Sequence, residues 1–514
     1  MLHAPRSVFA GLLDANLGRR PRYVRALDDL PMRRTKILAT VGPATQTTEQ
    51  VVALIRAGAD ALRLNLAHGT PDEHRAYLRT IHVAARQTGR EVAVVADVPG
   101  PKVRIGPIQG GELRLKVGET WTFDSVAAAG DAERVRLELP SFRGAARAGD
   151  PILLGDGSIE LKVLSTRAGR IVAEVVNGGN VRSRAGAYLP HARLNAAAFD
   201  ADDRKRAAVA LTEGIDFLAL SFVRDSVDVV AARRWLNKQD KGKDVGIIAK
   251  IERAEALKAI DGILRDADGI MVARGDLGIE VPLERLPLEQ KELIGRANAA
   301  GRFAIVATQV LLSMVNSPRP TRAEVTDVAN AVLDGADALM LSEESTVGHF
   351  PVEAVQWLDR IARATEAVFD PRRTRELVRA YQTDPATAPE RSVAAAAVAL
   401  AEGVKASVIV TPTHSGRTAR LIAGLRPSCP VVALTRRSLV RRRLALVRGV
   451  EARPSPTQGK IMELRRQAIE LARSEGLADL GPIVLTLGFP VDGRPTNLVT
   501  LLDPSEGLPP SARP

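Results

Sequence analysis

The chain has 514 residues, of which 45% are hydrophobic and 26% charged, and its formal net charge is +12 with a pI near 10.1. At about 150 residues per domain, this length predicts about three domains of a soluble globular protein. The basic residues are spread along the chain among 60 acidic ones, and the densest basic run, residues 436–443, has no aromatic side chains on which bases could stack. No nucleic-acid partner is therefore expected.

Cys429 is the single cysteine. This excludes an intrachain disulfide and a multi-cysteine metal site, and predicts a reducing, cytoplasmic environment. No run approaches the roughly 18 apolar residues that span a membrane, so no membrane partner is expected. Residues 1–32 are predicted to be an N-terminal extension that could dock as a helix, because a long apolar segment and a cleavage site typical of a signal peptide are lacking.

From residue 33 onward, β-type runs alternate with amphipathic helical runs such as residues 49–57 and 324–333. The predicted strands are residues 36–41, 61–66, 92–98, 215–222, 245–251, 269–273, 303–308 and 338–341. Strands that alternate with helices pair in parallel through right-handed crossovers, and eight such units close a barrel. The sequence therefore predicts an α/β fold, a (β/α)8 TIM barrel formed by residues 33–98 and 191–369.

Residues 99–190 interrupt this alternation. They hold short, glycine-punctuated β-type runs at residues 113–117, 121–123, 135–139, 152–154, 159–163 and 171–175. We expect a small inserted β-barrel domain that acts as a lid over the C-terminal face of the barrel. Residues 370–514 are predicted to begin with a linker and to continue as a C-terminal α/β domain, with strands at residues 407–411, 431–434, 483–487 and 498–502.

Polar side chains follow nearly every predicted barrel strand, at the ends where the active sites of such barrels lie. Glu252 and Asp276 end neighbouring strands and are suited to hold one Mg²⁺ or Mn²⁺, with helix capping as the structural alternative. Lys250 lies two residues before Glu252 and would point to the same side of the strand. Its ammonium could stabilise charge on a transferring group, or it could form a salt bridge with either carboxylate.

Residues 269–280 lead a β-type run into a Gly-Asp-Leu-Gly turn and then into a helix, so backbone N–H groups and one carboxylate meet at a strand end. No Gly-x-x-x-x-Gly-Lys-Ser/Thr loop occurs, so a Walker-type loop does not hold a nucleotide. A metal, a lysine, several arginines and a backbone anion site fit phosphoryl transfer, or enolate chemistry on a small carboxylate. The spacing alone leaves both reactions open.

Several long segments carry a family resemblance. They are RTKILATVGPA (34–44), ALRLNLAHG (61–69), IAKIE (248–252), DGIMVARGDLGIE (268–280), ATQ (307–309), NSPRPTRAEVTDVANAVLDG (316–335) and SGRTARL (415–421). From residue 33 almost to its end, the chain resembles the pyruvate kinase family. The resemblance implies phosphoryl transfer from phosphoenolpyruvate to ADP, giving pyruvate and ATP, in a homotetramer that responds to a phosphorylated small-molecule effector.

The resemblance also implies a role for each site residue. Lys250 stabilises the transferring phosphoryl group, Arg63 contacts the substrate phosphate, and Glu252 with Asp276 holds the divalent metal. The positions that receive the substrate carboxylate are Gly275, Asp276 and Thr308, of which Thr308 also lies near the site of enolate protonation. The nucleotide-side positions are Asn65, His68 and Arg104, and the lid carboxylate is Asp156. The usual lid lysine has no clear counterpart, and Arg184 is the nearest substitute.

The monovalent-cation site of the family is altered in this chain. Asn65 and Asp97 remain, whereas Ala67 and Val98 replace a serine and a threonine, and Lys102 stands where potassium-dependent members carry glutamate. A lysine ammonium is a fixed positive charge that can take the place of K⁺. We therefore expect K⁺-independent activity; the alternative is a degraded site with an exposed Lys102.

Two further departures lie close to the expected site. Ser342-Glu343-Glu344-Ser345 replaces the usual Ser-Gly-Glu-Thr, and Leu312 stands where glutamate is common. Glu343 is expected to bring an extra carboxylate near the anionic substrate and so to lower turnover.

In the C-terminal domain, a loop leads from a strand into a helix whose first turn offers N–H donors and hydroxyls. The predicted effector-phosphate residues are Thr411, Thr413, Ser415, Gly416, Arg417 and Thr418, with residues 488–493 nearby. A loop that merely closes the fold is the structural alternative.

The sequence leaves two alternatives to pyruvate kinase activity open. A metal-dependent lyase or aldolase acting on an enolpyruvate would use the same barrel but would leave the lid without a role. A catalytically weak paralogue would bind phosphoenolpyruvate or an effector as a sensor.

Overall fold

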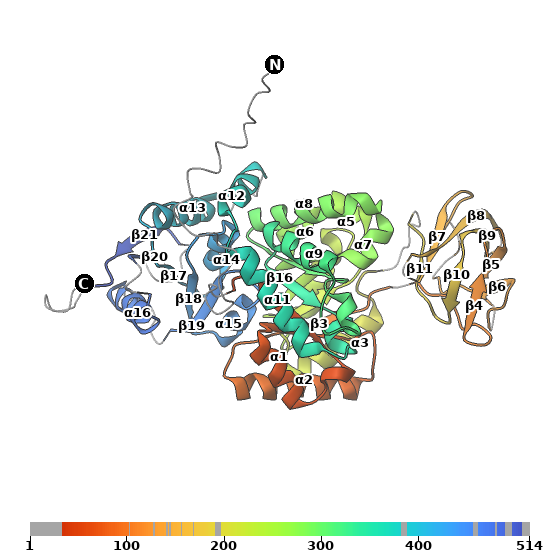
Figure 1. The fold of residues 1–514 in the computed structure, drawn as a ribbon, viewed down its shortest axis with the longest axis horizontal. Helices are drawn as coiled ribbons and strands as arrows, with labels where there is room; N and C mark the ends of the chain where they lie inside the picture. Colours follow the sequence, from red (N-terminus) through yellow and green to blue (C-terminus); the bar gives the residue numbers. More distant parts are fainter. Residues whose placement is uncertain are drawn as a thin grey trace, which may run out of the picture.

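The computed structural model describes residues 33–505 except 102, 127–128, 140–141, 143–144, 156, 168, 191–196, 382–387, 456–460, 478–480 and 489–495. The expectations for residues 1–32, Lys102, Asp156 and residues 489–493 lie outside the described part. Figure 1 shows three bodies in a row: the C-terminal α/β domain, the barrel, and the inserted β domain at the far end.

The barrel is closed and parallel, in the order β1-β16-β15-β14-β13-β12-β3-β2. Its strands are β1 (Lys36–Val41), β2 (Ala61–Asn65), β3 (Ala93–Val98), β12 (Phe217–Leu220), β13 (Gly246–Ile251), β14 (Gly269–Ala273), β15 (Phe303–Ala307) and β16 (Ala338–Leu341). All eight predicted strands are confirmed, each within two residues at either end. The predicted TIM barrel is therefore confirmed.

Helices surround the barrel. They are α1 (Thr48–Ala57), α2 (Pro71–Thr88), α3 (Ala201–Glu213), α4 (Ser226–Leu236), α5 (Ala254–Lys258), α6 (Ile260–Asp266), α7 (Arg274–Glu280), α8 (Leu286–Ala299), α9 (Arg322–Leu333), α10 (Glu343–Thr346) and α11 (Pro351–Glu366). Thr47, Thr70 and Thr321 each accept the N–H of the residue three positions later in a capping box. No helix among the described residues is long and apolar enough to cross a membrane.

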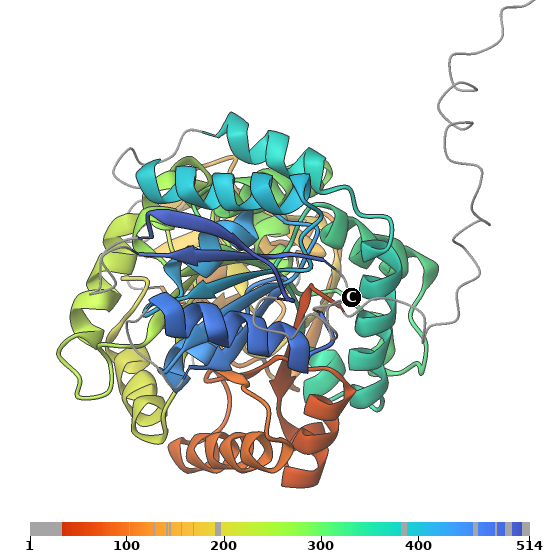
Figure 2. The same ribbon diagram turned by 90° about the vertical axis from the view of Figure 1, so that its left-hand side faces the viewer.

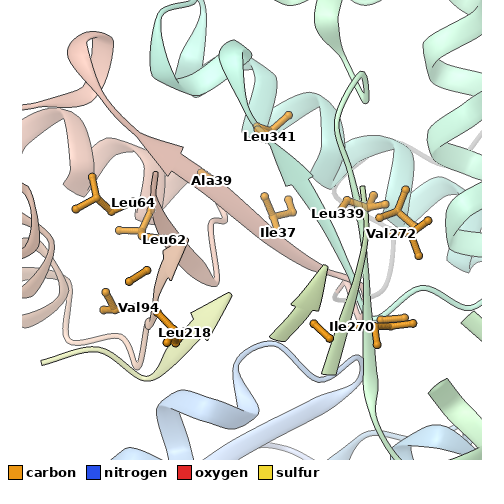
Figure 3. Close-up of a cluster of buried hydrophobic side chains, with 14 of the residues drawn as sticks. Ile37, Ala39, Leu62, Leu64, Val94, Leu218, Ile270, Val272, Leu339 and Leu341 are labelled. Atoms are coloured by element: carbon orange, nitrogen blue, oxygen red, sulfur yellow. The ribbon is translucent and has the colours of Figure 1, made fainter. Parts of the chain in front are cut away.

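Side-chain alternation along the strands divides the barrel into two apolar layers. The outward set, part of which is drawn in Figure 3, packs beneath the helices and includes Ile37, Leu62, Val94, Leu218, Ile270 and Leu339. The inward set includes Leu38, Val95, Ile248 and Met271, and it is continuous with apolar side chains of the C-terminal domain. Polar residues at inward positions near the strand ends must therefore face the barrel mouth.

The inserted domain has two strands more than predicted. Its strands are β4 (Glu112–Leu115), β5 (Thr120–Asp124), β6 (Arg134–Arg136), β7 (Pro151–Leu154), β8 (Ile159–Arg167), β9 (Arg170–Asn177), β10 (Gly179–Arg182) and β11 (Ala187–Tyr188). In place of one closed barrel they form a six-stranded sheet, β11-β7-β8-β9-β5-β6, and a two-stranded sheet, β10-β4. A Cβ on Gly178 would lie 2.5 Å from the carbonyl oxygen of Leu115, and this close approach lets the chain leave β9 and pair with β4.

The C-terminal domain is a doubly wound sheet in the order β19-β18-β17-β20-β21. Its strands are β17 (Val408–Pro412), β18 (Val431–Thr435), β19 (Val450–Pro454), β20 (Ile483–Leu487) and β21 (Leu498–Leu502). Its helices are α12 (Pro371–Ala380), α13 (Ala388–Gly403), α14 (Arg417–Gly424), α15 (Ser438–Leu444) and α16 (Ile461–Ser474). The predicted α/β domain is confirmed, whereas α12 occupies part of the expected linker, and β19 and α15 were not predicted.

Four aspartates repeat at the N-terminal ends of alternate barrel strands. Asp60, Asp216, Asp268 and Asp337 immediately precede β2, β12, β14 and β16. Their carboxylates accept the backbone N–H groups of Ile37, Val94, Ile247 and Ala304 on the preceding strand, at 2.9–3.0 Å. Each aspartate thus ties two neighbouring strands together at the closed end of the barrel.

Arginines of the C-terminal domain dock on three of these aspartates. Figure 2 shows this domain covering one end of the barrel. The ion pairs are Arg442 with Asp216 at 3.0 Å, Arg443 with Asp268 at 2.7 Å, and Arg426 with Asp337 at 3.0 Å. Arg437 and Arg441 pair with Asp244 and Glu91 in the same interface. The densest basic run of the sequence is therefore used in domain docking.

Candidate active site

A pocket opens at the C-terminal ends of the barrel strands. It is lined by Arg63, Asn65, Ala67, His68, Asp97, Pro99, Arg104, Ser221, Phe222, Lys250, Glu252, Met271, Ala273, Asp276, Thr308, Met340 and Ser342. The structure therefore brings the predicted catalytic, metal and nucleotide-side residues into one cavity, with Gly275 adjoining it. Inward alternation on β2, β3 and β13 explains why Arg63, Asp97 and Lys250 meet there.

Lys250 stands at the centre of a buried charge cluster. Its Nζ lies 2.9 Å from Oε1 of Glu252 and 3.3 Å from Oδ1 of Asp97, and it donates to Oγ of Ser221 at 2.6 Å. Burial lowers the pKa of Lys250, but Asp97 and Glu252 outweigh burial and raise the pKa above its usual value. The lysine is therefore a permanent positive charge that faces the pocket.

Arg63 and Asp97 complete this cluster. Nε of Arg63 donates to Oδ2 of Asp97 at 2.7 Å, and its Nη1 donates to Oγ1 of Thr40 at 3.1 Å. Burial opposes ionisation of Asp97, but Lys250 and Arg63 overcome this effect and hold the pKa of its carboxyl below the usual value. Asp97 thus orients two cations toward the same cavity.

The negative charge of Asp276 acts on the carboxylate of Glu252. Burial is the largest cause of the raised pKa of Glu252; Lys250 lowers it and Asp276 raises it further. Oε2 of Glu252 accepts the N–H of Phe222 at 2.7 Å, and Phe222 has a left-handed φ of 55°. Glu252 and Asp276 are the residues that would hold a divalent cation, whose charge would offset the repulsion that acts on Glu252.

The predicted Gly-Asp-Leu-Gly turn is the first turn of α7, which begins directly at the end of β14. The N–H of Gly275 donates to Oγ1 of Thr308 at 2.8 Å. Thr308 has a left-handed φ of 65°, and Arg274 donates to its carbonyl oxygen at 2.9 Å and pairs with Asp327. The structure therefore joins Gly275 to Thr308 directly before Asp276, one of the two carboxylates predicted to bind a metal.

Comparisons with known proteins give one result over nearly the whole chain. The family model "Pyruvate kinase, barrel domain" matches residues 32–355, and "Pyruvate kinase, alpha/beta domain" matches residues 391–502. The chain belongs to the pyruvate kinase family. The pyruvate kinase of Geobacillus stearothermophilus is 41% identical over 91% of this chain and 80% of its own length, and that of Thermotoga maritima is 37% identical over 92% and 99%. A crystal structure of a pyruvate kinase from Cryptosporidium parvum superposes with a TM-score of 0.86 at 33% identity, over 92% of this chain and 96% of that one.

The residues predicted to lie on the nucleotide side, Asn65, His68 and Arg104, line the pocket. Oδ1 of Asn65 accepts the N–H of Ala67 at 3.1 Å, and the carbonyl oxygen of His68 lies 2.6 Å from Nε2 of His74. Arg104, at the start of the inserted domain, donates to the carbonyl oxygen of Arg184 at 3.0 Å. Arg104 lines the pocket, and the carbonyl oxygen of Arg184 holds its guanidinium; Arg184 itself is not among the lining residues.

At the altered monovalent-cation position, the remaining oxygen atoms already have partners. Asp97 is paired with Arg63 and Lys250, and Asn65 accepts from Ala67. The carbonyl oxygen of Val98 accepts the hydroxyl of Ser221 at 2.7 Å. Each of these three residues thus has a protein cation or hydrogen-bond donor as a partner.

The expectation that Glu343 adds a charge to the pocket is wrong. Ser342 lines the pocket, but Glu343 starts α10 with an exposed side chain and is absent from the lining. Glu344 is the buried carboxylate of this segment, and it accepts the N–H groups of Leu311 at 3.0 Å and Ser342 at 2.7 Å.

Three contributing residues were not predicted: Ser221, Thr40 and Tyr188. Ser221 directly follows β12, so the rule that polar groups at strand ends face the site would have found it. Thr40 takes an inward position on β1 beside Arg63. The hydroxyl of Tyr188, at the end of the inserted domain, donates to Oδ1 of Asp276 at 2.7 Å. Burial and the nearby Asp276 raise the pKa of Tyr188, which keeps its hydroxyl protonated.

Proposed function

We propose that this chain transfers the phosphoryl group of phosphoenolpyruvate to ADP and releases pyruvate and ATP. The observation that carries the proposal is the position of Lys250, which is held at 2.9 Å from Glu252 in a pocket that also contains Arg63 and Asp276. Pyruvate kinases that share 36–41% of their residues with this chain support it.

Each pocket residue has a role in this reaction. Arg63 binds the substrate phosphate, and Lys250 stabilises negative charge on the phosphoryl group as it moves toward ADP. The Gly275 and Asp276 backbone and Thr308 bind the substrate carboxylate, and Thr308 is near the site where the enolate is protonated. Glu252 and Asp276 would hold Mg²⁺ or Mn²⁺, which supplies charge neutralisation when it is bound. The described residues contain no group of three or more His, Cys, Asp or Glu that could hold a metal, so substrate and water oxygens must complete the shell.

Pyruvate formation that requires both ADP and Mg²⁺ is the decisive measurement. A lyase or aldolase would consume substrate without ADP, and a binding sensor would show ligand-induced thermal stabilisation without turnover. Either result would displace the proposed kinase activity. The presence of the inserted domain favours kinase activity over the two alternatives, because its Arg104 lines the pocket at the expected nucleotide side.

We also propose that the activity does not require K⁺. The engaged oxygen atoms of Asp97, Asn65 and Val98 support this, together with Lys102 at the position of a glutamate. Full activity is expected in K⁺-free tetramethylammonium buffer. Lys102→Glu is expected to lower that activity and to restore a response to KCl. Strong activation of the unaltered protein by KCl would contradict the proposal.

A phosphorylated effector is proposed to bind where β17 and β20 adjoin. Strand order reverses there, as at the binding crevices of doubly wound sheets. Thr411 and Thr486 follow the paired residues Val410 and Leu485 on these strands, and within the described residues their buried hydroxyls have no hydrogen-bond partner. Of the predicted loop residues, Oγ1 of Thr413 accepts the N–H of Gly416 at 2.9 Å, and Arg417 pairs with Glu390.

Thermal shifts with sugar phosphates and nucleoside monophosphates test the effector site. Thr411→Val should abolish the shift, whereas Thr500→Val on the exposed part of β21 should not. If no phosphate shifts the melting temperature, the loop only closes the fold.

A cytoplasmic homotetramer is proposed as the working form. The antiparallel strand β21 ends the C-terminal sheet, and Leu498 and Leu501 on it are exposed. An apolar edge strand is suited to pair with a second copy. Mass measurement in solution tests the subunit number.

A further inference from the structure

Tyr188 of the inserted domain contacts Asp276, a proposed metal ligand on the barrel. Tyr188 ends β11, which pairs antiparallel with β7, and it lies just before the chain returns to the barrel. Its side chain is buried, and its hydroxyl donates to Oδ1 of Asp276 at 2.7 Å. The lid and the metal site are therefore joined by a direct hydrogen bond.

A second contact lies on the same barrel helix. A Cβ on Gly157 of the inserted domain would lie 3.3 Å from Cγ1 of Ile279 on α7. Figure 1 shows β7 and β11 on the side of the inserted domain that faces α7. The seven-residue helix that carries Asp276 is thus where the lid rests on the barrel.

A phenol is well suited to hold a metal-binding carboxylate. Asp276 and Glu252 line the same pocket, so an arginine or lysine in the place of Tyr188 would cancel negative charge that a divalent cation needs. A neutral hydroxyl uses one of about four lone-pair positions of the carboxylate and leaves its charge intact. Hydrogen-bond donors of this kind fix the orientation of metal ligands in many proteins.

We propose that Tyr188 is a positioning residue that couples the lid to the divalent metal. When the inserted domain rests on α7, the Tyr188 hydroxyl orients Asp276 for the ion. This inference rests on the proposed role of Asp276 as a metal ligand. Because coupling between two binding events is reciprocal, metal binding favours the resting position of the lid as much as the lid favours metal binding.

The first test measures binding of Mn²⁺ to the substrate-free protein by the electron paramagnetic resonance signal of the free ion. Tyr188→Phe keeps the ring and removes the hydroxyl, and it should weaken Mn²⁺ binding about 10-fold, the lower end of the effect of such outer contacts. Tyr77→Phe, which removes a phenol hydroxyl from α2, is the matched control and should not change the affinity. Asp276→Asn should lose the site.

The second test measures lid position and turnover. Mn²⁺ should slow proteolysis of the connections to the inserted domain in the unaltered protein, and this protection should be lost in Tyr188→Phe. In the kinase assay, the variant should need about 10-fold more Mg²⁺ for half-maximal rate, with a smaller change in kcat at saturating Mg²⁺.

The outcomes separate this inference from the proposed metal site. Unchanged Mn²⁺ affinity and unchanged protection in Tyr188→Phe would overturn the role of Tyr188 while leaving Asp276 as a ligand. Mn²⁺ binding that survives Asp276→Asn would overturn both.

Discussion

At the scale of single residues, the pocket depends on how Lys250 is held. Three oxygen atoms from three strands or their ends surround its ammonium: Glu252, Asp97 and Ser221. Two of these partners are buried carboxylates, and within the cluster only Lys250 and Arg63 balance their negative charge. Lys250 therefore both presents charge to the substrate and stabilises the site around it.

Lys250→Met is predicted to lower kcat by a factor of about 10² to 10³, because the charge that meets the moving phosphoryl group is lost. Substrate binding, followed by thermal shift with phosphoenolpyruvate, should change less, since Arg63 remains. Lys258→Met, at an exposed position on α5, is the control and should keep full turnover. Unchanged turnover in Lys250→Met would refute the assigned role.

Asp203 gives a prediction about pH. Its buried Oδ1 accepts the N–H of Gly100 at the entrance to the inserted domain, and burial followed by the charge of Asp200 raises its pKa to about 6. A raised carboxyl pKa means that the unfolded chain ionises first as pH rises, so the stability contributed by this site is present below about pH 4 and is lost as pH rises through about 6.

Asp203→Asn cannot ionise and should escape this loss. Its stability relative to the unaltered protein should rise between pH 4 and pH 7 by up to about 3 kcal/mol, from a shift of about two units at 1.36 kcal/mol each. Urea unfolding at several pH values measures it. Asp202→Asn, exposed in the same helical turn, should show no such rise. Parallel pH profiles for Asp203→Asn and the unaltered protein would contradict the prediction.

At the scale of elements, two glycines make room for aromatic rings inside the barrel. Gly246 and Gly269 begin β13 and β14, where Cβ atoms would lie 2.5 Å from the ring of Phe217 and 2.3 Å from the ring of Phe303. These two rings pack edge to face with centroids 5.3 Å apart. The strand that leads to Asp276, β14, therefore begins with a glycine packed against a phenylalanine ring.

Gly269→Ala is predicted to destabilise the protein by about 1–3 kcal/mol, because the buried Phe303 ring cannot move aside. Chemical unfolding with activity as a second readout tests it. Gly403→Ala, at a helix end with no atom within 4 Å of the added Cβ, should be neutral. Equal effects of the two substitutions would argue against a packing cause.

Nearly continuous apolar runs between helical segments made the barrel strands predictable, and elements without such a run were missed. β11 has two residues and β19 reads Val-Glu-Ala-Arg-Pro, so neither contains a continuous apolar run. α15 is rich in arginine, and ion pairs with the barrel fix its place.

Within the site, residues on barrel strands could be placed because strand ends converge. Tyr188 could not, because its contact depends on where a separate domain rests and no local pattern in the sequence records that position.

At the scale of the whole molecule, the C-terminal domain and the barrel share a buried ionic interface. Arg426 is almost fully buried and donates to both oxygen atoms of Asp337 and to the side chain of Asn298. The N–H of Arg448 donates to Asp337 as well. Because Asp337 also accepts from Ala304 in the neighbouring strand, the same carboxylate joins the two domains and closes the barrel.

Arg426→Met is predicted to cost about 3–5 kcal/mol, since it leaves the Asp337 carboxylate buried without its charged partner. Arg75→Met, which breaks an exposed pair with Asp72, should cost at most about 1 kcal/mol. Urea unfolding of both variants gives the comparison. A loss for Arg426→Met no larger than that for Arg75→Met would show that the interface contributes little.

Strand β14 has neighbouring domains at both of its ends. Asp268, one residue before it, is clamped by Arg443 of the C-terminal domain, and Asp276, three residues after it, is clamped by Tyr188 of the inserted domain. The five extended residues of β14 rise about 16 Å and are all buried, so one short strand connects the two contacts. A ligand that moved the C-terminal domain relative to Asp268 would displace β14 directly. The hydrogen-exchange rate of the Met271 amide, midway along the strand, would report this displacement.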